Sequence, residues 1–208
     1  MSIYSEVASP ISFSSNEPMD AVVESLLTCI EARDATLRRH SERVARYADH
    51  IAEALGLDSD TRHQLALGSL LHDIGNIGIP DSILLKPTGL TTWEFNEMRL
   101  HPIIGEQICR PIVALAVALP LVRSHHEKLD GSGYPDGLKG DEIPAVVRIL
   151  SVTDVYDTLR CERAYRDAFT HEQALEILEG EAGRGWWDAE IIARLANVTA
   201  PESDFVPV

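Results

Sequence analysis

The stretch Leu70-Leu71-His72-Asp73-Ile74-Gly75 decides how the rest of this sequence is interpreted. A histidine and an aspartate stand side by side at the end of an apolar run, and a glycine follows two residues after the aspartate. At a helix end, such an imidazole and carboxylate can bind one metal ion, or the carboxylate can bridge two ions. Because many exposed turns also contain a His-Asp pair, the metal assignment depends on the other histidines and aspartates of the chain.

Further imidazole and carboxylate side chains stand at other predicted helix ends. They suit Fe or Mn, with Zn as the alternative, and no nearby cysteine pair offers a thiolate site. Seven groups are too many for one tetrahedral ion, so we predict two divalent transition-metal ions bridged by Asp73. Such a pair can hold a hydroxide between the ions and clamp a phosphoryl group. The predicted metal ligands are His40, His72, Asp73, His101, His125, His126 and Asp154.

The remaining histidines are interpreted as structural, because a lone histidine is more often a hydrogen-bonded core or capping residue. His50 and His63 lie in predicted helices with charged neighbours, and His171 lies in a capping segment. Glu127 directly follows the last histidine pair. We expect its carboxylate to orient one of these two imidazoles from outside the metal coordination sphere.

Composition indicates one soluble globular domain. The chain has 208 residues, of which 45% are apolar and 25% are charged. The formal net charge of -15 disfavours a long nucleic acid or an anionic membrane surface as partner. An anionic substrate is compatible with this charge if metal ions and a few arginines set the local field.

Cysteine usage and the lack of a targeting signal predict a cytoplasmic protein with no membrane anchor. The three cysteines form no CxxC motif, so we expect a reducing compartment and buried thiols. The first residues lack a basic region followed by an apolar core, so no secretory signal peptide is expected. The longest apolar run, Ile112 to Val122, contains Pro120 and is shorter than the roughly 20 residues of a membrane span. We predict a buried core helix there.

Capping signals divide the chain into predicted helices. Asp58 is a predicted N-cap for a helix that delivers His72 and Asp73 at its C-terminal end. Thr91 and Glu94 have the capping-box form and predict a helix up to His101, where Pro102 intervenes. Other helices are predicted from about Met19, from Ser41 to Leu55 with His40 at or just inside its beginning, after Pro144, after Thr170 and from Ile191 to Leu195.

No convincing alternating strand longer than a few residues appears between these helices. We therefore predict an all-α fold, a single compact multi-helix domain over residues 19–200, with a metal site formed from several helix ends. Residues 1–18 are rich in serine, and we predict that they form a mobile arm. We predict that residues 201–208 form a tail.

The sequence resembles the HD-GYP family, the HD-superfamily phosphodiesterases that act on cyclic di-GMP. The resemblance runs from about Asp34 to Leu195 and rests on a combination of motifs. These are His40-Ser41-Glu42-Arg43-Val44, Leu71-His72-Asp73-Ile74-Gly75, Ile79-Pro80-Asp81, Lys86-Pro87, His101-Pro102, His125-His126-Glu127, Asp130-Gly131-Ser132-Gly133-Tyr134-Pro135, Ile143-Pro144, Asp154-Val155-Tyr156-Asp157 and Arg163-Ala164-Tyr165-Arg166.

The resemblance implies a function and a set of site residues. It places the family's metal ligands on the same seven residues, with Asp73 central to catalysis. It places Tyr134 in the loop that covers the substrate, and Arg163 and Arg166 at positions that contact the substrate phosphates. The implied reaction is hydrolysis of cyclic di-GMP to the linear dinucleotide pGpG, or on to GMP, by a hydroxide that bridges two metal ions.

Two positions depart from the family pattern. Asn76 stands where the family has a lysine near the scissile phosphate, so a hydrogen-bond donor replaces a cation at a catalytic position. Thr36 stands where some members have a glutamate that recruits a third ion, which again predicts two ions. Because of Asn76, an alternative function stays open, in which the chain is a catalytically weak module that binds metal and nucleotide and signals through contacts with other proteins. A phosphohydrolase of another cyclic dinucleotide is the further alternative.

The implied reaction and the net charge determine the partners that we expect. A cyclic dinucleotide is the expected substrate, and long nucleic acids and membranes are not expected as partners. A homodimer or a contact with a signalling protein is left open, because the sequence shows no receiver or sensory domain of the kind often joined to this module.

Overall fold

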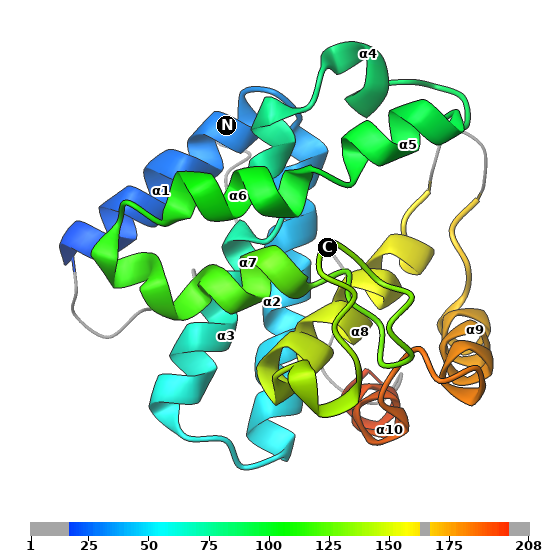
Figure 1. Ribbon diagram of the computed structural model, residues 1–208. Helices are drawn as coiled ribbons and strands as arrows, with labels where there is room; N and C mark the ends of the chain where they lie inside the picture. Colours follow the sequence, from blue (N-terminus) through cyan, green and yellow to red (C-terminus); the bar gives the residue numbers. More distant parts are fainter. Residues whose placement is uncertain (1–16, 163–166, 200–208) are drawn as a thin grey trace, which may run out of the picture.

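The computed structural model describes residues 17–162 and 167–199, and within them every regular element is a helix. The predicted all-α fold is therefore confirmed (Figure 1). The predicted arm and tail lie outside the described residues, except that the first helix begins at Glu17. The α-helices are α1 (Glu17–Glu31), α2 (Ala35–Ala54), α3 (Ser59–Leu71), α4 (Asp81–Leu84), α5 (Thr92–Met98), α6 (His101–Cys109), α7 (Leu119–Ser124), α8 (Ala145–Arg160), α9 (His171–Gly183) and α10 (Ala189–Val198). The 3-10 helices are η1 (Ile74–Gly78), η2 (Val113–Ala118) and η3 (Gly140–Glu142).

Helix α2 runs through the centre of the fold and contacts α1, α3, α8 and α10 (Figure 1). It begins earlier than the sequence indicated, because the side chain of Asp34 accepts a hydrogen bond from the backbone of Thr36 and caps the helix. His40 therefore lies inside α2 and not at its beginning. The positive φ of Gly56 lets the chain leave the helix after its C-terminal end.

Two clusters of buried side chains form the core. The first joins α2 with α8, α9 and α10, and the second joins α1 and α3 with η1 and η2. Both α2 and α3 contribute to the two clusters, since Leu65 belongs to the first and Leu67 to the second. The clusters therefore adjoin along the two helices that carry His40 and lead to His72, and the described residues form one domain.

The segment before His101 folds differently from the sequence-based prediction. Helix α5 ends at Met98, and α6 begins at His101 with Pro102 in its first turn. Proline is tolerated there because the first backbone N–H groups of a helix have no partner within the helix. His101 thus begins a helix, whereas the prediction placed it at the end of one.

The predicted core helix over Ile112 to Val122 is also wrong in part. The segment forms η2 and the first turns of α7, with Pro120 near the start of α7. In a 3-10 helix residues three apart share a face, which buries Leu115 and Ala118. Val113 lies on another face and is 87% exposed.

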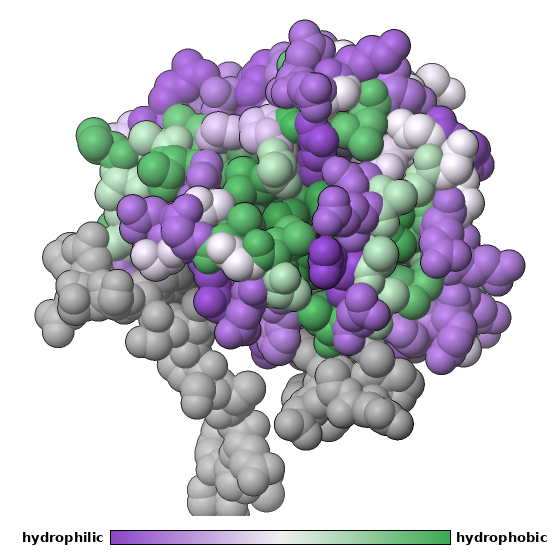
Figure 2. Space-filling view, turned by 90° about the horizontal axis from the view of Figure 1, so that it is seen from below, coloured by the Kyte–Doolittle hydropathy of each residue, from purple (hydrophilic) through white to green (hydrophobic). Residues whose placement is uncertain are grey.

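Surface properties complete the description of the fold. No described helix has the length and apolar character needed to cross a membrane. Of the cysteines, Cys109 is buried, Cys161 is partly buried and Cys29 is exposed, so the prediction of three buried thiols is wrong for Cys29. On the face shown in Figure 2, apolar residues gather near the middle and hydrophilic residues surround them.

Candidate metal centre

The seven predicted ligand residues come from five places in the fold that converge on one point. His40 lies on α2, the pair His72-Asp73 follows α3, and Asp154 lies on α8. His101 is the first residue of α6, and the last pair follows α7. Their ligand atoms form two groups in which all atoms lie within 4.8 Å of one another. One group is Asp73, His101, His125 and His126, and the other is His40, His72 and Asp73.

Asp73 belongs to both groups, and its two carboxylate oxygens face different imidazoles. Oδ1 lies 3.3 Å from Nε2 of His101 and 3.9 Å from Nε2 of His125. Oδ2 lies 3.6 Å from Nε2 of His72. Asp154 stands outside both groups as defined, but its Oδ1 lies 3.0 Å from Nε2 of His40 and 3.8 Å from that of His72. The arrangement gives one shared carboxylate between two sets of nitrogen ligands.

Three of the imidazoles are oriented in the same way, each by a backbone carbonyl three residues earlier. Nδ1 of His72 lies 2.7 Å from the carbonyl oxygen of Ser69. Nδ1 of His101 and Nδ1 of His125 lie 2.8 and 3.0 Å from the corresponding carbonyl oxygens. A carbonyl oxygen only accepts, so each Nδ1 carries the proton and donates it. Each Nε2 is left as a lone pair directed at the other ligands, which is the form that binds a metal ion.

The hydrogen bonding of these imidazoles by itself indicates that the arrangement fits a divalent metal ion. Nε2 of His101 and Nε2 of His125 lie 3.1 Å apart, and both lack a proton when their Nδ1 atoms donate. Nε2 of His72 is buried and has no hydrogen-bond partner. Two nitrogen lone pairs that face each other are unfavourable, and so is a buried acceptor without a donor, unless a cation binds these nitrogen atoms. The donor set of imidazoles and carboxylates is one that divalent transition metals accept.

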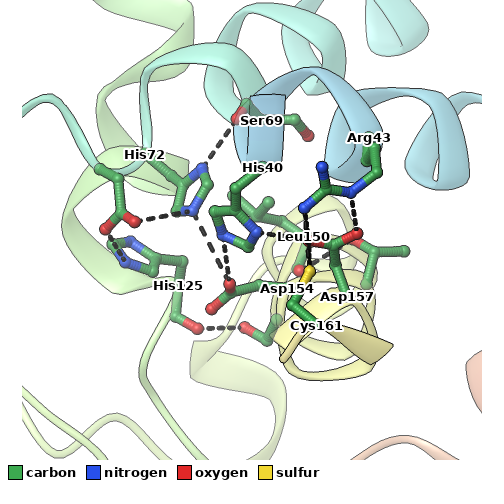
Figure 3. A network of polar contacts seen from close by, with 12 residues as sticks. His40, Arg43, Ser69, His72, His125, Leu150, Asp154, Asp157 and Cys161 are labelled. Atoms are coloured by element: carbon green, nitrogen blue, oxygen red, sulfur yellow. Dashed lines mark hydrogen bonds and ion pairs between the residues drawn. The ribbon is translucent and has the colours of Figure 1, made fainter. Parts of the chain in front are cut away.

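His40 is oriented by a carboxylate and not by the backbone. Its Nδ1 lies 2.7 Å from Oδ2 of Asp157 (Figure 3). Arg43 donates to both oxygens of this carboxylate, from Nε to Oδ1 at 2.7 Å and from Nη2 to Oδ2 at 2.8 Å. Burial lowers the pKa of His40, but hydrogen bonds to Asp154 and Asp157 outweigh burial and raise the pKa to about 10. Metal binding by His40 therefore has to displace a proton that it shares with Asp154.

The pKa values of His125, His126 and Asp73 are shifted toward the forms that bind a metal ion. Burial lowers the pKa of His125 and of His126 well below the ordinary value, and neighbouring imidazoles add to the effect. Burial alone would raise the pKa of the Asp73 carboxyl, but nearby imidazoles, that of His72 first, outweigh burial and lower it. Neutral imidazoles beside an ionised carboxylate are what metal coordination requires.

Glu127 holds the loop that carries Tyr134, which corrects the expectation that it orients an imidazole. Its Oε1 accepts hydrogen bonds from the backbone N–H groups of Asp136 and Gly137, and its Oε2 accepts one from Leu138. The carboxylate is buried and closes the turn from within. Three backbone donors bound to a buried carboxylate make a strong anchor.

Gly133 lets this loop pack directly on the segment after the histidine pair. A Cβ atom at Gly133 would lie 2.4 Å from the backbone of Glu127. The backbone N–H of Tyr134 donates to the carbonyl oxygen of His126 at 3.2 Å. The Tyr134 ring lies 4.7 Å from the His126 ring, centre to centre, at an angle of 31°. Tyr134 is thus placed beside the metal centre, as its predicted role in covering a substrate requires.

The positions expected near the substrate phosphates are placed only in part. Asn76 lies in η1 and is buried, and its Oδ1 has no hydrogen-bond partner. Its backbone carbonyl accepts a hydrogen bond at 3.0 Å from Arg33, which also binds the carboxylate of Asp81. Arg163 and Arg166 lie outside the described residues, so their predicted phosphate contacts stay predictions.

Sequence reasoning missed Arg43 and Asp157 as residues that orient His40, one of the predicted metal ligands. A signal for them exists, because Arg43 is three residues after His40 and Asp157 is three residues after Asp154. Residues at this spacing share one face of a helix. Of the histidines interpreted as structural, His171 accepts or donates a hydrogen bond at 2.8 Å with the hydroxyl of Tyr156, which agrees with that interpretation.

Comparison with known families supplies the identification. The HD domain family matches residues 24–191, which is most of the chain. This chain is an HD-domain protein.

Relatives of this HD-domain protein confirm its predicted membership of the HD-GYP family. The cyclic di-GMP phosphodiesterase response regulator RpfG from Xanthomonas campestris is 42% identical over 161 residues, covering 76% of this chain and 43% of that protein. The 3'3'-cGAMP-specific phosphodiesterase 3 from Vibrio cholerae is 39% identical over 164 residues, covering 77% of this chain and 36% of that protein. The HD-domain chain therefore spans about two fifths of the length of the relatives that it matches.

Solved structures show the same fold. The structure of Bd1817, described as an HDG"Y"P protein from Bdellovibrio bacteriovorus, superposes with a TM-score of 0.68 at 20% identity. The match covers 88% of the HD-domain chain and 62% of the other chain. At this identity the likeness concerns the fold alone.

Proposed function

We propose that this HD-domain chain is the hydrolase module of a metal-dependent phosphodiesterase that opens cyclic di-GMP to the linear dinucleotide pGpG. The observation that carries the proposal is the position of Asp73, whose two carboxylate oxygens face separate sets of imidazoles. Such a carboxylate is suited to bridge two ions, and we propose two ions of Fe or Mn, with Zn as the alternative.

The residues of the chain have distinct tasks in this proposal. His72, His101 and His125 present their Nε2 atoms to the ions, because backbone carbonyls hold their Nδ1 protons. His40, His126 and Asp154 complete the two coordination spheres. Bound ions would supply Lewis acidity toward a phosphate oxygen and lower the pKa of a water molecule. Tyr134 then covers the substrate from the side of His126.

The relatives support a cyclic dinucleotide as substrate. Their names include cyclic di-GMP phosphodiesterases and 3'3'-cGAMP-specific phosphodiesterases, at identities near 40% for the first three. We choose cyclic di-GMP because two of these three carry it in their names, and because the Gly133-Tyr134-Pro135 loop of the HD-GYP pattern is complete. We further propose that the module extends over residues 19–200 and acts in the cytoplasm, where its three free cysteines stay reduced.

The test is hydrolysis of cyclic di-GMP by protein reconstituted with Mn or Fe, with products separated by chromatography over time. The expected result is conversion to pGpG that requires the metal, with slower conversion of 3'3'-cGAMP. The Asp73→Asn variant should lose the activity, and the His63→Gln variant on α3 should keep it. Faster hydrolysis of 3'3'-cGAMP would contradict the substrate assignment, and activity that survives Asp73→Asn would contradict the site.

A second function is favoured by one observation, the uncharged and buried side chain of Asn76. Without the family's lysine, the module would bind metal and cyclic dinucleotide but hydrolyse the nucleotide too slowly to matter, and it would signal through contacts. Equilibrium binding of cyclic di-GMP together with the absence of metal-dependent hydrolysis would favour this function over the first.

A further inference from the structure

Helix α5 brings an arginine to the outer side of the Tyr134 ring. The guanidinium carbon of Arg99 lies 4.6 Å from the ring centre of Tyr134, and the ring of Phe95 approaches Tyr134 edge-on at 6.5 Å. Phe95 and Arg99 are four residues apart and share one side of α5 and its C-terminal end. The Tyr134 ring also packs on His126, so Arg99 is separated from the metal centre by a single side chain.

Arg99 differs from most arginines of the described residues, because it forms no ion pair, a property that it shares with Arg39, Arg46 and Arg160. Arg33, Arg43, Arg62 and Arg123 all bind carboxylates, some of them with both guanidinium edges. Within residues 17–162 and 167–199, no carboxylate lies within ion-pair distance of Arg99. Glu94 on the same helix is bound instead to Lys86 at 2.6 Å.

The geometry of Arg99 leaves its hydrogen-bond donors available to an anion. The guanidinium carbon of Arg99 lies over the Tyr134 ring, and a guanidinium that stacks on a ring keeps its N–H groups in the plane, directed away from the ring. Two parallel N–H groups of this kind match two oxygens of a phosphate. The side chain is only half-buried, so a ligand can reach it from solvent.

Two other described cations, Arg33 and Lys86, are already engaged. Arg33 binds the backbone of η1 and the carboxylate of Asp81, and Lys86 binds Glu94. A cyclic dinucleotide carries two phosphates, and a pair of ions bridged by one carboxylate can hold one of them. The second phosphate then needs cations from the protein at the edge of the site, beside those predicted at Arg163 and Arg166.

We propose that Arg99, stacked on Tyr134, binds the substrate phosphate that the metal centre does not hold. This role rests on the proposed function and adds a specificity-determining residue to it. Arg99 selects ligands with two phosphates because the stack fixes its guanidinium at one distance from the centre. The contact forms with the intact substrate, so it acts mainly on substrate affinity and little on the rate of bond cleavage.

The test compares two substrates in the Arg99→Gln variant of the metal-loaded protein. Cyclic di-GMP has two phosphates, and bis(p-nitrophenyl) phosphate has one. For cyclic di-GMP we expect KM to rise roughly tenfold to hundredfold, as for loss of a hydrogen bond to a charged group, with kcat changed by less than about threefold. For bis(p-nitrophenyl) phosphate both constants should be unchanged. Calorimetric binding of a phosphorothioate analogue of cyclic di-GMP should weaken by the same factor as KM rises.

Controls separate this role from a structural one. Arg194→Gln changes an arginine on α10 that forms only an exposed pair with Glu190, and it should alter neither substrate. Arg99→Lys keeps the charge without the fork and should fall between the wild type and Arg99→Gln. Metal content and thermal stability should be the same in all variants.

Each other outcome decides against a definite part of the proposal. Unchanged KM and binding in Arg99→Gln would overturn the role of Arg99 and leave the proposed function intact. An equal loss for both substrates would overturn it as well, because Arg99 would then act through the metal centre. If the wild type cleaves bis(p-nitrophenyl) phosphate but neither binds nor cleaves cyclic di-GMP, the proposed substrate is wrong and the role of Arg99 is wrong with it.

Discussion

Gly75 lies so close to His101 that a Cβ atom on Gly75 would stand 1.8 Å from the carbonyl oxygen of His101. The same atom would stand 2.6 Å from the backbone nitrogen of Gly105. The lack of a side chain at Gly75 therefore lets η1 and α6 pack backbone against backbone. This packing sets the His101 imidazole 3.3 Å from the carboxylate of Asp73.

The Gly75→Ala substitution should consequently damage both stability and metal binding. The methyl group must push α6 away from η1, and we expect the free energy of unfolding to fall by about 1–3 kcal/mol. Metal content after reconstitution should fall with it, because His101 moves away from Asp73. Urea unfolding and elemental analysis measure the two effects.

Gly180→Ala on α9 is the matched control for this substitution. A Cβ atom there would meet nothing within 4 Å, so alanine should leave metal content unchanged and stabilise the helix by up to about 1 kcal/mol. A Gly75→Ala protein with full stability and metal content would show that α6 does not depend on this contact.

Metal stoichiometry tests the shared position of Asp73. We expect about two ions per chain, because Asp73 belongs to two groups of ligands. Asp73→Ala should lower the metal content of both groups, whereas His50→Ala on the far part of α2 should leave it unchanged. Elemental analysis of protein purified without oxygen gives the number. One tightly held ion in the wild type, or equal losses in the two variants, would remove the two-ion arrangement.

The contact of Asp157 with His40 should matter for metal affinity although Asp157 is not a proposed ligand. The Asp157→Asn substitution weakens the hold on Nδ1 of His40 and breaks the pairing with Arg43. Loss of a residue that orients a metal ligand typically lowers metal affinity roughly 10-fold to 100-fold. Competition with a chelator measures this change.

Asp49→Asn is the comparison for that variant, because Asp49 forms a similar two-bond pair with Arg62 that is far more exposed. We expect that substitution to cost less than about 1 kcal/mol of stability and no metal affinity. Similar chelator curves for the two variants would show that Asp157 does not orient His40.

Asn76→Lys tests the departure from the family pattern. The Asn76 side chain is buried and its Oδ1 is unpaired, so its loss removes no hydrogen bond at that oxygen. Losing one charge stabiliser in the transition state costs roughly 10²–10³ in rate, and restoring the cation should raise turnover by up to that factor. Metal content should not change. Asn76→Met, of similar length but uncharged, should leave turnover as it is, and an equal rise in both variants would mean that charge is not the cause.

The η2 segment offers a paired test of the fold. Leu115 is fully buried in the second core cluster, so Leu115→Asp should lower the free energy of unfolding by at least about 3 kcal/mol. Val113, two residues earlier, is 87% exposed, and Val113→Asp should change it by no more than about 0.5 kcal/mol. Thermal or urea denaturation gives both values. Equal effects would mean that η2 does not present two different faces.

Local signals predicted the helices well where a cap or a steady apolar period was present. The Asp58, Thr91 and Thr170 caps all form as expected, because each depends only on residues within one turn. The signals failed around Pro102 and Pro120. A proline marks a helix boundary, but the local sequence does not say whether the helix ends before it or begins with it.

The sequence by itself determined which side chains were predicted to form the metal centre of this HD-domain protein, since the His-Asp pair and the other imidazoles are visible without coordinates. Only the tertiary structure decided how they are shared between two groups and what holds them. The Asp157–Arg43 pair and the contact of Gly75 with His101 depend on distances between helices far apart in the chain, whereas the carbonyls that orient three of the imidazoles are only three residues away. The stack of Arg99 on Tyr134 has the same origin, because a charge without a partner becomes evident only when every nearby carboxylate has been placed.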